Sequence, residues 1–438
     1  MSRHASRPRL PIAAALALTL VVAVLLLLSV FKDTKQSAAG VPLPPAATPT
    51  LSALAPQPAW DSLVRYADSL QPADFGQAME RVYGDGTPDW TAFFEVSPVP
   101  DRPRVEITQW SADPQNPRLG IPLRGNRPAP RYWREAGELP PSPDPSNRPM
   151  EGVRVAIDPG HIGGAWARME ERWYQLPGEQ TQVMEGEMTL VTARILKTAL
   201  ETLGATVTLV REATEPVTAT RPVDYERLVG TKPQAELYFY RKAEIRARAD
   251  RVNTSIRPDL VVCLHFNAEP WGEPGKVTFT DTNHLHLIVN GHYSRDELAL
   301  DDVRFEMLQR LFQRAEREEL RLADAVSRSL AAATGLPPYN YQAGHMAGNA
   351  HRPLPENPYV WARNLMANRL YQCPVVFTEP YVMNNRDVFD RVAAGDYPGE
   401  KWVAGALRKS LYREYAEAVA AGLKAHFSAF RPPAAPPK

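Results

Sequence analysis

Short apolar runs that lead into a histidine or a glutamate most strongly constrain how this chain can fold. Runs of four to six β-branched and apolar residues are typical of strands that are buried on both faces of a parallel sheet. Three such runs are residues 153–157, 260–264 and 375–378. His161 lies just beyond the first run, and His265 and Glu379 directly follow the other two. The pattern predicts strands of one sheet that carry polar side chains to a common edge.

Helical patterns alternate with these runs. Apolar side chains recur at helical spacing in residues 188–203, 241–253, 301–333 and 412–427. Two further strands are expected at residues 205–210 and 284–289. Gly204 lies just past the first helix, where a left-handed cap is favoured. The alternation predicts an α/β domain over residues 150–430, with a mostly parallel sheet flanked by helices.

The residues at the strand ends have the chemistry of a metal site. In open α/β sheets the reacting groups collect beyond the carboxyl ends of the strands, so His161, His265 and Glu379 are expected at one edge. Glu185, which precedes the helical pattern at residues 188–203, is expected there too. Two imidazoles and one carboxylate are the ligands of an open catalytic zinc site, and a further carboxylate can act as its base. The residues therefore favour a zinc hydrolase.

Each of these residues has a simpler explanation when it is taken alone. Residues 158–160 can form a plain turn, and His265 can be a hydrogen-bonded histidine at a strand end. Glu185 suits the first turn of a helix, where a negative charge is favoured. Glu379 is the hardest to explain in this way, because burial of a carboxylate without a partner is costly. The shared placement favours one site, in which Asp158 orients an imidazole.

The first 35 residues indicate where the chain works. Residues 10–31 are apolar apart from Thr19 and Ser29, and they are flanked by arginines before and lysines after. About 20 apolar residues span a bilayer, whereas the apolar part of a cleaved signal is shorter. We therefore expect an uncleaved membrane anchor in residues 1–35, with a cytoplasmic N-terminus; a cleaved export signal is the alternative. Either way, the catalytic region is expected outside the cytoplasm.

Prolines mark the segments between the expected domains. The chain has 43 prolines, about twice the usual share. They indicate a Pro/Ala-rich linker at residues 36–58 and a disordered tail at residues 431–438. Short helical and strand patterns at residues 59–149 predict a small α+β module, whose role stays open.

Charge and cysteine content narrow the class of protein. The 50 acidic and 50 basic residues balance, so nothing in the composition argues for nucleic acid as a partner. The chain has only two cysteines, Cys263 and Cys373, which excludes a disulfide framework, and both lie in apolar runs. Buried free thiols are favoured over a bridge between neighbouring strands.

Two further patterns allow more than one interpretation. The charged stretch at residues 304–321 is expected to be the solvated face of a long helix; a regulatory helix that covers the metal is the alternative. His284 and His286 alternate on a strand, so they share a face and mimic a ligand pair. A polar strand face beside the site explains them as well.

Four ordered motifs between residues 153 and 385 are similar to those of a known family. They are residues 155–164 (VAIDPGHIGG), 185–211 (EGEMTL onwards), 264–268 (LHFNA) and 374–385 (PVVFTEPYVMNN). Together they resemble the motifs of the zinc-dependent N-acetylmuramoyl-L-alanine amidases of the Amidase_3 type. Ile162 stands where a glycine is usual, and we expect it to narrow the approach to His161.

The resemblance implies a fold, a cofactor and an activity. The fold is an amidase/phosphorylase-like sandwich, and the cofactor is one zinc ion held by His161, Glu185 and His265, with Glu187 as the alternative to Glu185. Glu379 is the catalytic residue. The activity is hydrolysis of the amide bond between N-acetylmuramic acid and L-alanine in peptidoglycan, and a protein activator is a candidate partner. Positions expected at the substrate or behind the ligands are Asp158, Arg248, Asn267 and Asn385.

Other functions fit the same motifs. A zinc peptidase that cuts within the stem peptide has the same metal chemistry in a different groove. A catalytically silent module that binds the cell wall or an activator keeps the fold without turnover. Extra length relative to the family is expected to reshape the groove, at residues 212–240, 271–283, 296–335 and 342–361.

Overall fold

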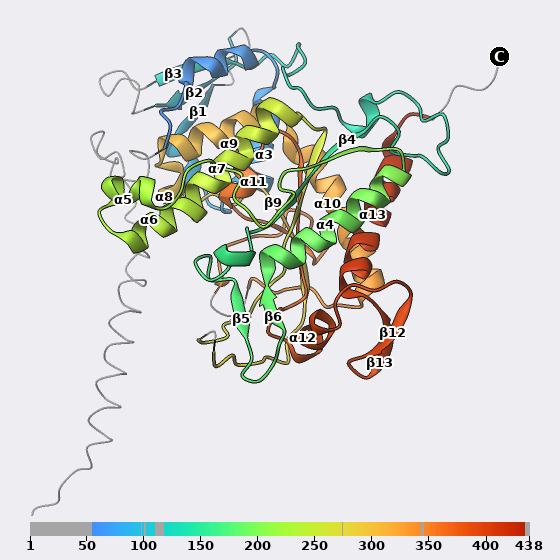
Figure 1. Cartoon of the computed structure of the whole chain (residues 1–438). Helices are drawn as coiled ribbons and strands as arrows, with labels where there is room; N and C mark the ends of the chain where they lie inside the picture. The colour runs from blue at the N-terminus through green and yellow to red at the C-terminus, as the bar shows by residue number, and fades with distance from the viewer. Residues whose placement is uncertain are drawn as a thin grey trace, which may run out of the picture. The chain divides into compact units, whose positions relative to one another are not determined.

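A six-stranded mixed sheet forms the centre of the fold (Figure 1). Its order is β10-β9-β11-β8-β4-β7. The strands are β4 (Arg154–Pro159), β7 (Thr206–Leu209), β8 (Leu260–Leu264), β9 (Leu285–Val289), β10 (Val360–Ala362) and β11 (Val375–Pro380). The strands β11, β8, β4 and β7 run parallel, whereas β9 and β10 run the opposite way. The sheet is mostly parallel, as predicted, and the reversed edge pair is an addition.

The computed structural model describes residues 55–97, 99, 102–109, 118–273, 275–342 and 346–433. All of these residues belong to one compact unit. The expected membrane anchor, most of the linker and residues 434–438 of the expected tail lie outside them. Within the described part, none of the helices combines the length and the apolar character that crossing a bilayer requires.

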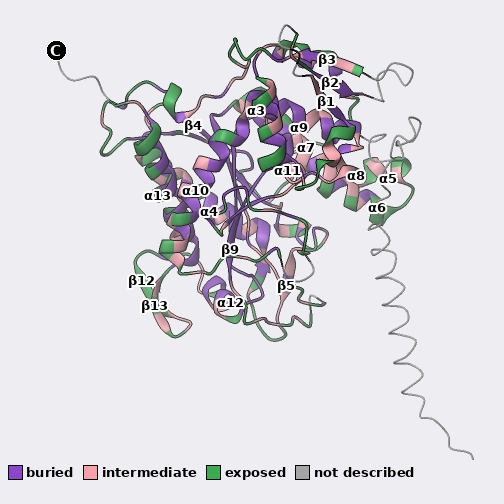
Figure 2. Cartoon of the chain, turned by 180° about the vertical axis from the view of Figure 1, so that it is seen from behind, coloured by how far each residue is buried: buried purple, intermediate pink, exposed green. Residues whose placement is uncertain are grey.

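Helices cover both faces of the sheet. On one face, α4 (Glu185–Thr202) and α10 (Ala315–Thr334) both pack against α13 (Leu411–Phe430). On the other face, α7 (Glu244–Asp250) and α11 (Met366–Leu370) add side chains to a cluster of buried strand residues. Figure 2 shows the resulting burial along the central strands, in purple. The layered α/β architecture follows from these two apolar interfaces.

Further segments complete the domain around this core. The remaining helical segments are η5 (Gly164–Trp166), α5 (Val223–Val229), α6 (Lys232–Tyr238), η6 (Phe239–Ala243), η7 (Arg251–Ile256), α8 (Arg295–Leu298), α9 (Asp301–Gln313) and α12 (Arg386–Ala393). Two hairpins are β5 (Trp173–Gln175) with β6 (Gln182–Met184), and β12 (Glu400–Val403) with β13 (Ala406–Lys409). Cys263 and Cys373 are buried and free, as favoured.

The helix expected at residues 301–333 is two helices. Arg314 has a left-handed backbone, with φ of 59°, and separates α9 from α10. The charged stretch is not a solvated face, because Arg304, Arg310 and Glu319 are fully buried. Arg310 forms an ion pair with Glu319 inside the protein. The expectation was wrong because helical charge alone does not reveal what packs over a helix.

The module at residues 59–149 packs on α9. It contains β1 (Phe94–Ser97), β2 (Arg104–Thr108) and β3 (Arg118–Pro122) in an antiparallel sheet, with η1 (Trp60–Tyr66), α3 (Pro72–Ala78), η2 (Met79–Tyr83), η3 (Pro88–Ala92) and η4 (Ala136–Glu138). Tyr66 stacks on Phe312 with 5.7 Å between ring centroids. The buried Trp133 donates a hydrogen bond to Gln313 at 2.9 Å. These contacts make the module part of the same folded unit.

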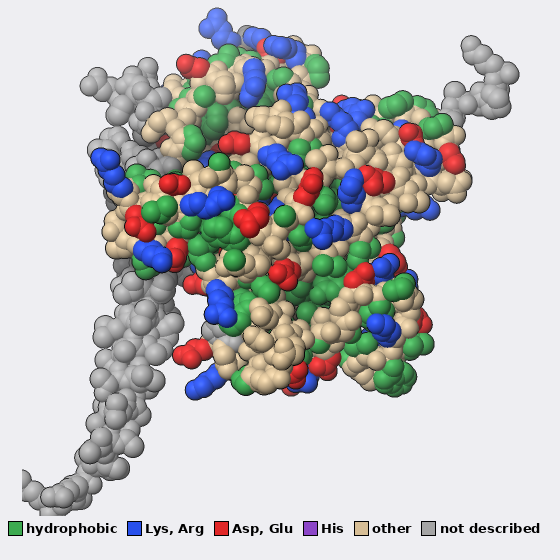
Figure 3. All heavy atoms as spheres, in the orientation of Figure 1, with side chains coloured by type: hydrophobic (Ala, Val, Ile, Leu, Met, Phe, Trp, Pro, Cys, Tyr) green, Lys and Arg blue, Asp and Glu red, His purple; other side chains and the backbone are tan. Residues whose placement is uncertain are grey.

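The surface and the end of the last helix add two details. Basic and acidic side chains are interspersed over the face in Figure 3, in line with the balanced composition.

Arg431, at the start of the expected tail, is nearly buried and donates to the carbonyl oxygens of Pro140 and Pro149 at 2.6 and 2.8 Å. The first residue of that segment is therefore packed.

Candidate active site

Three neighbouring strands bring the candidate residues to one edge of the sheet. In the register, Leu264 of β8 is the partner of both Pro159 in β4 and Thr378 in β11. The residues that follow these positions, among them His265 and Glu379, therefore emerge at the same level. The parallel arrangement expected from the apolar runs thus explains why they meet.

A glycine lets two of these strand ends approach closely. A Cβ atom on Gly160 would lie 2.3 Å from Cε1 of His265, closer than real contacts allow. His161 follows with a left-handed backbone, at φ of 55°. The His265 ring also stacks on Phe377, with 4.5 Å between centroids. The two imidazoles thereby face each other, with their ring centroids 5.2 Å apart.

Glu185 joins the two histidines from the start of α4. This helix begins at Glu185 itself, three residues earlier than expected. Its Oε1 atom accepts a hydrogen bond from the Phe266 amide at 3.0 Å and lies 3.0 Å from His265 Nδ1. Its Oε2 atom lies 3.2 Å from His161 Nε2. Burial raises the pKa of Glu185, but the charges of both histidines outweigh it and lower the pKa to about 2.

These three side chains fit a metal ion. One ligand atom from each of His161, Glu185 and His265 lies within 4.8 Å of the others. Within the described residues, Glu185 Oε2 is buried and has no hydrogen-bond partner, although Arg172 Nε approaches it to 3.2 Å. An unsatisfied buried carboxylate oxygen is costly unless a cation binds it. Two nitrogens and one carboxylate oxygen suit a borderline divalent ion such as zinc.

Glu379 lies outside this group of three. It belongs to β11, and its cross-strand partner is His286 of β9. Burial and the negative charge of Glu185 raise the pKa of Glu379 to about 8. A carboxyl group with a pKa in this range can exchange a proton near neutral pH, as a general base must.

Glu170 supports His161, and the sequence analysis missed it. Its carboxylate accepts hydrogen bonds from the amides of Ile162 and Gly163 at 2.9 and 3.0 Å, and lies 3.5 Å from His161 Nδ1. Burial raises the pKa of Glu170, but the bond to His161 and the backbone bonds prevail and lower it. Because the segment around Glu170 has no strand or helix pattern, only a carboxylate nine residues after a histidine hinted at this role.

Asp158 and Arg248 act below the site and contact no imidazole. Asp158 binds Arg248 at 2.9 Å and accepts a hydrogen bond from the Tyr371 hydroxyl. Arg248 also donates to the carbonyl oxygens of Pro159 and His161, at 2.8 and 2.7 Å. We expected Asp158 to orient an imidazole, and this expectation was wrong. Asp158 instead anchors Arg248, which holds the turn between Pro159 and His161.

Asn267 and Asn385 hold loops near the site. Asn267 accepts from the Ala268 amide at 2.7 Å, and its side-chain nitrogen lies 3.4 Å from His286 Nδ1. Asn385 caps α12 and donates to the Thr280 carbonyl oxygen at 3.1 Å. The side-chain hydrogen bonds of both residues hold loops and a helix start, and none of these bonds reaches His161, Glu185 or His265.

Ile162 does not narrow the approach to His161. Its side chain is fully buried and packs in a small cluster with Phe239 and Tyr240. The expectation failed because the insertion at residues 212–240 supplies aromatic partners for this side chain. The departure from glycine is therefore accommodated by packing in the core.

His284 and His286 share a face, as their spacing predicted. Their ring centroids are 6.2 Å apart. His286 Nε2 lies 3.0 Å from the Tyr341 hydroxyl, and His284 Nε2 lies 3.2 Å from Glu269. Both are buried, and neither belongs to the metal-binding group. They form a polar wall beside Glu379.

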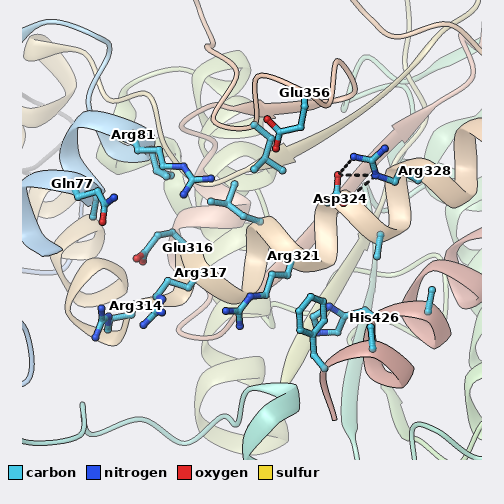
Figure 4. Close-up of a pocket in the computed structure, with 18 of the residues that line it drawn as sticks. Gln77, Arg81, Arg314, Glu316, Arg317, Arg321, Asp324, Arg328, Glu356 and His426 are labelled. Atoms are coloured by element: carbon cyan, nitrogen blue, oxygen red, sulfur yellow. Dashed lines mark hydrogen bonds and ion pairs between the residues drawn. The ribbon is translucent and has the colours of Figure 1, made fainter. Parts of the chain in front are cut away.

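A large cavity lies away from this edge, between α3, α10 and α13. It has a volume of about 890 Å³, and Arg81, Arg317 and Arg321 are among its lining residues (Figure 4). Asp324 and Arg328 form an ion pair at one end. The cavity contains none of the three metal-binding candidates, so its size does not mark the active site.

The comparison with protein families identifies the class of enzyme. The model of the family described as N-acetylmuramoyl-L-alanine amidase matches residues 155–411, which include all four candidate residues. The chain belongs to this family. It is accordingly an amidase that hydrolyses the bond between N-acetylmuramic acid and L-alanine in peptidoglycan.

Solved structures of amidases are similar to this chain. The apo form of Ami1 from Mycobacterium abscessus has 19% identity and a TM-score of 0.35, covering 63% of this chain and 99% of its own. Ami1 from Mycobacterium smegmatis has 17% identity and a TM-score of 0.35, with 64% and 99% covered. The CwlD amidase from Clostridioides difficile, in complex with the GerS lipoprotein, has 15% identity and a TM-score of 0.35, with 63% and 98% covered. No curated protein sequence matches the chain.

Proposed function

We propose that this amidase works with one zinc ion, held by His161, Glu185 and His265, and that Glu379 is its general base. The observation that carries the proposal is the buried Glu185 Oε2 atom, which has no hydrogen bond among the described residues and faces His161 Nε2. Arg172 Nε lies 3.2 Å from this oxygen without forming a hydrogen bond, so a metal ion between the oxygen and the two imidazoles would satisfy it. The ligand set of two histidines and one glutamate leaves a coordination position for water.

The chain supplies the proton transfers. A zinc ion held by His161, Glu185 and His265 would polarise the scissile carbonyl and lower the pKa of water to about 7. Glu379 takes the proton from the attacking water and delivers it to the nitrogen of the leaving L-alanine, which departs as an amine. The charge of Glu185 is one cause of the raised pKa of Glu379. Because a dication neutralises that charge, Glu379 is ionised more readily in the loaded site.

The surrounding residues keep the ligands in place. Glu170 accepts hydrogen bonds from the amides of Ile162 and Gly163, which follow His161 in the chain. Arg248 donates to the carbonyl oxygens of Pro159 and His161 in the same turn. His265 is fixed by the Phe377 ring and by Glu185. Such supporting contacts set the orientation and basicity of metal ligands.

Digestion of purified sacculi followed by mass analysis tests the reaction. Free stem peptides that begin with L-alanine are the expected product. Stem peptides cut internally would instead support a zinc peptidase, and zinc binding without any product would support a silent wall-binding module. Each of these two outcomes would contradict the proposed reaction.

Metal analysis of two glutamate variants tests the ligand set. Glu185→Gln is expected to lose zinc, since it removes the buried charge between the histidines. Glu187→Gln is the matched control, two residues away in the same turn of α4, and is expected to keep zinc. If Glu185→Gln retained zinc and Glu187→Gln lost it, Glu187 would be the ligand instead of Glu185.

The apolar run at residues 10–31 supports an enzyme that is exported and anchored in the membrane. Peptidoglycan lies outside the cytoplasm, so export is required for contact with the substrate. Membrane fractionation of the full chain, with protease added from outside, tests the anchor and its orientation. A protein activator stays a prediction.

A further inference from the structure

Two histidines meet at the end of the sheet opposite to the catalytic edge. His292 follows β9, which runs antiparallel to β11, so the chain leaves β9 far from Glu379. His351 precedes β10 and forms a bridge with Ala362. The Nδ1 atoms of the two rings are 3.1 Å apart. This pair is therefore separate from the site formed by His161, Glu185 and His265.

The hydrogen bonds of the pair place the hydrogen of each neutral ring on Nε2. His292 Nε2 lies 2.9 Å from the Gly348 carbonyl oxygen, and His351 Nε2 lies 2.8 Å from the Arg81 carbonyl oxygen. A carbonyl oxygen only accepts, so each Nε2 must carry the hydrogen. A neutral imidazole has only one such hydrogen. When both rings are neutral, two lone pairs lie 3.1 Å apart, which is unfavourable unless a proton or a metal ion bridges the two nitrogens.

Backbone hydrogen bonds fix the positions of both histidines. The His292 amide donates to the Val82 carbonyl oxygen at 2.8 Å. The Ala362 amide donates to the His351 carbonyl oxygen at 2.8 Å, and the His351 amide donates back to Ala362 at 3.3 Å. His292 has a left-handed backbone with φ of 55°, the same value as His161. Such strain in a residue other than glycine occurs often at functional sites.

We propose that His292 and His351 bind a divalent transition-metal ion through their Nδ1 atoms. With metal–nitrogen distances of about 2.05 Å, a separation of 3.1 Å corresponds to an angle of about 100° at the metal. This angle lies between those of square-planar and tetrahedral sites. The Nε2–H groups on carbonyl oxygens match the usual support of metal-bound histidines, which fixes the tautomer.

The surroundings leave space for further ligands. A cavity of about 330 Å³ adjoins His292. The other residues that line it are Ser294, Glu297, Gly348, Asn349, Arg363 and Asn364. Both imidazoles are only partly buried, so ions reach them from solvent. Water molecules complete the coordination and hydrogen-bond to these polar side chains. Imidazole nitrogens suit Cu²⁺, Ni²⁺ and Zn²⁺, with Cu²⁺ bound most tightly.

Copper titration of the zinc-loaded full chain tests this site. Electron paramagnetic resonance is expected to show one Cu²⁺ per chain with coupling to two imidazole nitrogens, while elemental analysis shows that the zinc is retained. His292→Gly is expected to weaken Cu²⁺ binding at least about tenfold and to keep amidase activity, since glycine tolerates the left-handed backbone. His351→Gln is expected to weaken Cu²⁺ binding in the same way.

A neighbouring variant controls for unspecific effects. Asn349→Ala alters the same cavity without removing an imidazole, and it is expected to bind Cu²⁺ like the wild type. Absence of copper uptake by the wild type would mean that the pair shares a proton only, and would overturn the proposal. Copper uptake that persists unchanged in both histidine variants would overturn it as well.

Discussion

The catalytic edge and the α9–α10 layer both bury charged side chains, but the partners of those charges differ. At the edge, Glu185 keeps one oxygen without a hydrogen bond, and Glu379 has a pKa raised to about 8 by burial and by the charge of Glu185. In the layer, Arg310 forms an ion pair with Glu319, and it donates to the Cys373 carbonyl oxygen at 3.0 Å. Glu319 in turn accepts from the Val375 amide at 2.8 Å.

The difference separates function from stability. In the layer, Arg310 Nε and Glu319 Oε2 also lack hydrogen bonds among the described residues, but the opposite charges of these two side chains face each other. Their bonds to backbone groups fix the packing of α10 against the start of β11. The edge at the other end of the same strand leaves ligand atoms open, at a cost in stability that the proposed metal ion would offset. Perturbed groups of this second kind cluster at functional sites. Variants in the two regions should therefore change different measured quantities.

The largest expected effect is on turnover. Glu379→Gln is expected to lower kcat by about 10²- to 10⁴-fold, because it removes the proton acceptor. Zinc content and thermal stability of the loaded enzyme should not fall, since Glu379 is not a ligand. Rates of stem-peptide release and metal analysis of the same sample provide the check. A variant that kept its turnover would remove Glu379 from the mechanism.

A comparable effect on stability is expected in the α9–α10 layer. Arg310→Met leaves Glu319 buried without its partner and is expected to lower the free energy of unfolding by about 3–5 kcal/mol. The zinc affinity of the folded fraction should not change. Arg328→Met is the matched control, because it removes an exposed ion pair with Asp324 worth about 0–1 kcal/mol. Chemical denaturation measures both, and equal losses would erase the distinction between the two pairs.

A smaller effect is expected from the support of His161. Glu170→Gln is expected to weaken zinc binding about 10- to 100-fold, since it removes the charge beside Nδ1. Glu171→Gln, at the exposed neighbouring position, is the control and should bind zinc like the wild type. Competition with a zinc chelator measures the affinities. Equal affinities of the two variants would show that Glu170 only supports the backbone.

The last prediction concerns pH and the metal-free protein. In the metal-free protein the pKa of Glu379, about 8, lies above its unfolded value of about 4.3. The stability that it contributes is therefore complete below about pH 4.3 and is lost as the pH rises towards 8. The Tm of the metal-free wild type should fall between pH 5 and pH 9, and Glu379→Gln should flatten this decline. A parallel decline in both proteins would show that other groups cause it.

The sequence revealed the edge because strand ends are local features. His265 and Glu379 directly follow apolar runs, so their meeting follows from parallel pairing alone. Glu170 escaped notice because its role depends on a loop that folds back to His161. The burial of Arg310 also escaped, because it depends on the distant carbonyl oxygens of Tyr371 and Cys373. Sequence periodicity does not encode contacts of that range.

The direction of β9 shows the same limit. An apolar run predicts a strand but not its orientation, and here β9 pairs with β11 in antiparallel fashion. This reversal places His286 beside Glu379 and sends His292 to the opposite end of the sheet. The left-handed Arg314, which divides the predicted helix, also lacked a glycine signal.

Anomalous diffraction at the zinc edge, from crystals of the zinc-loaded enzyme, tests the division of roles most directly. The expected map has a peak bonded to His161, Glu185 and His265, with Glu379 near the metal but outside its ligand shell. A peak coordinated by Glu379, or one that leaves Glu185 unbound, would contradict the assignment of three ligands and one base.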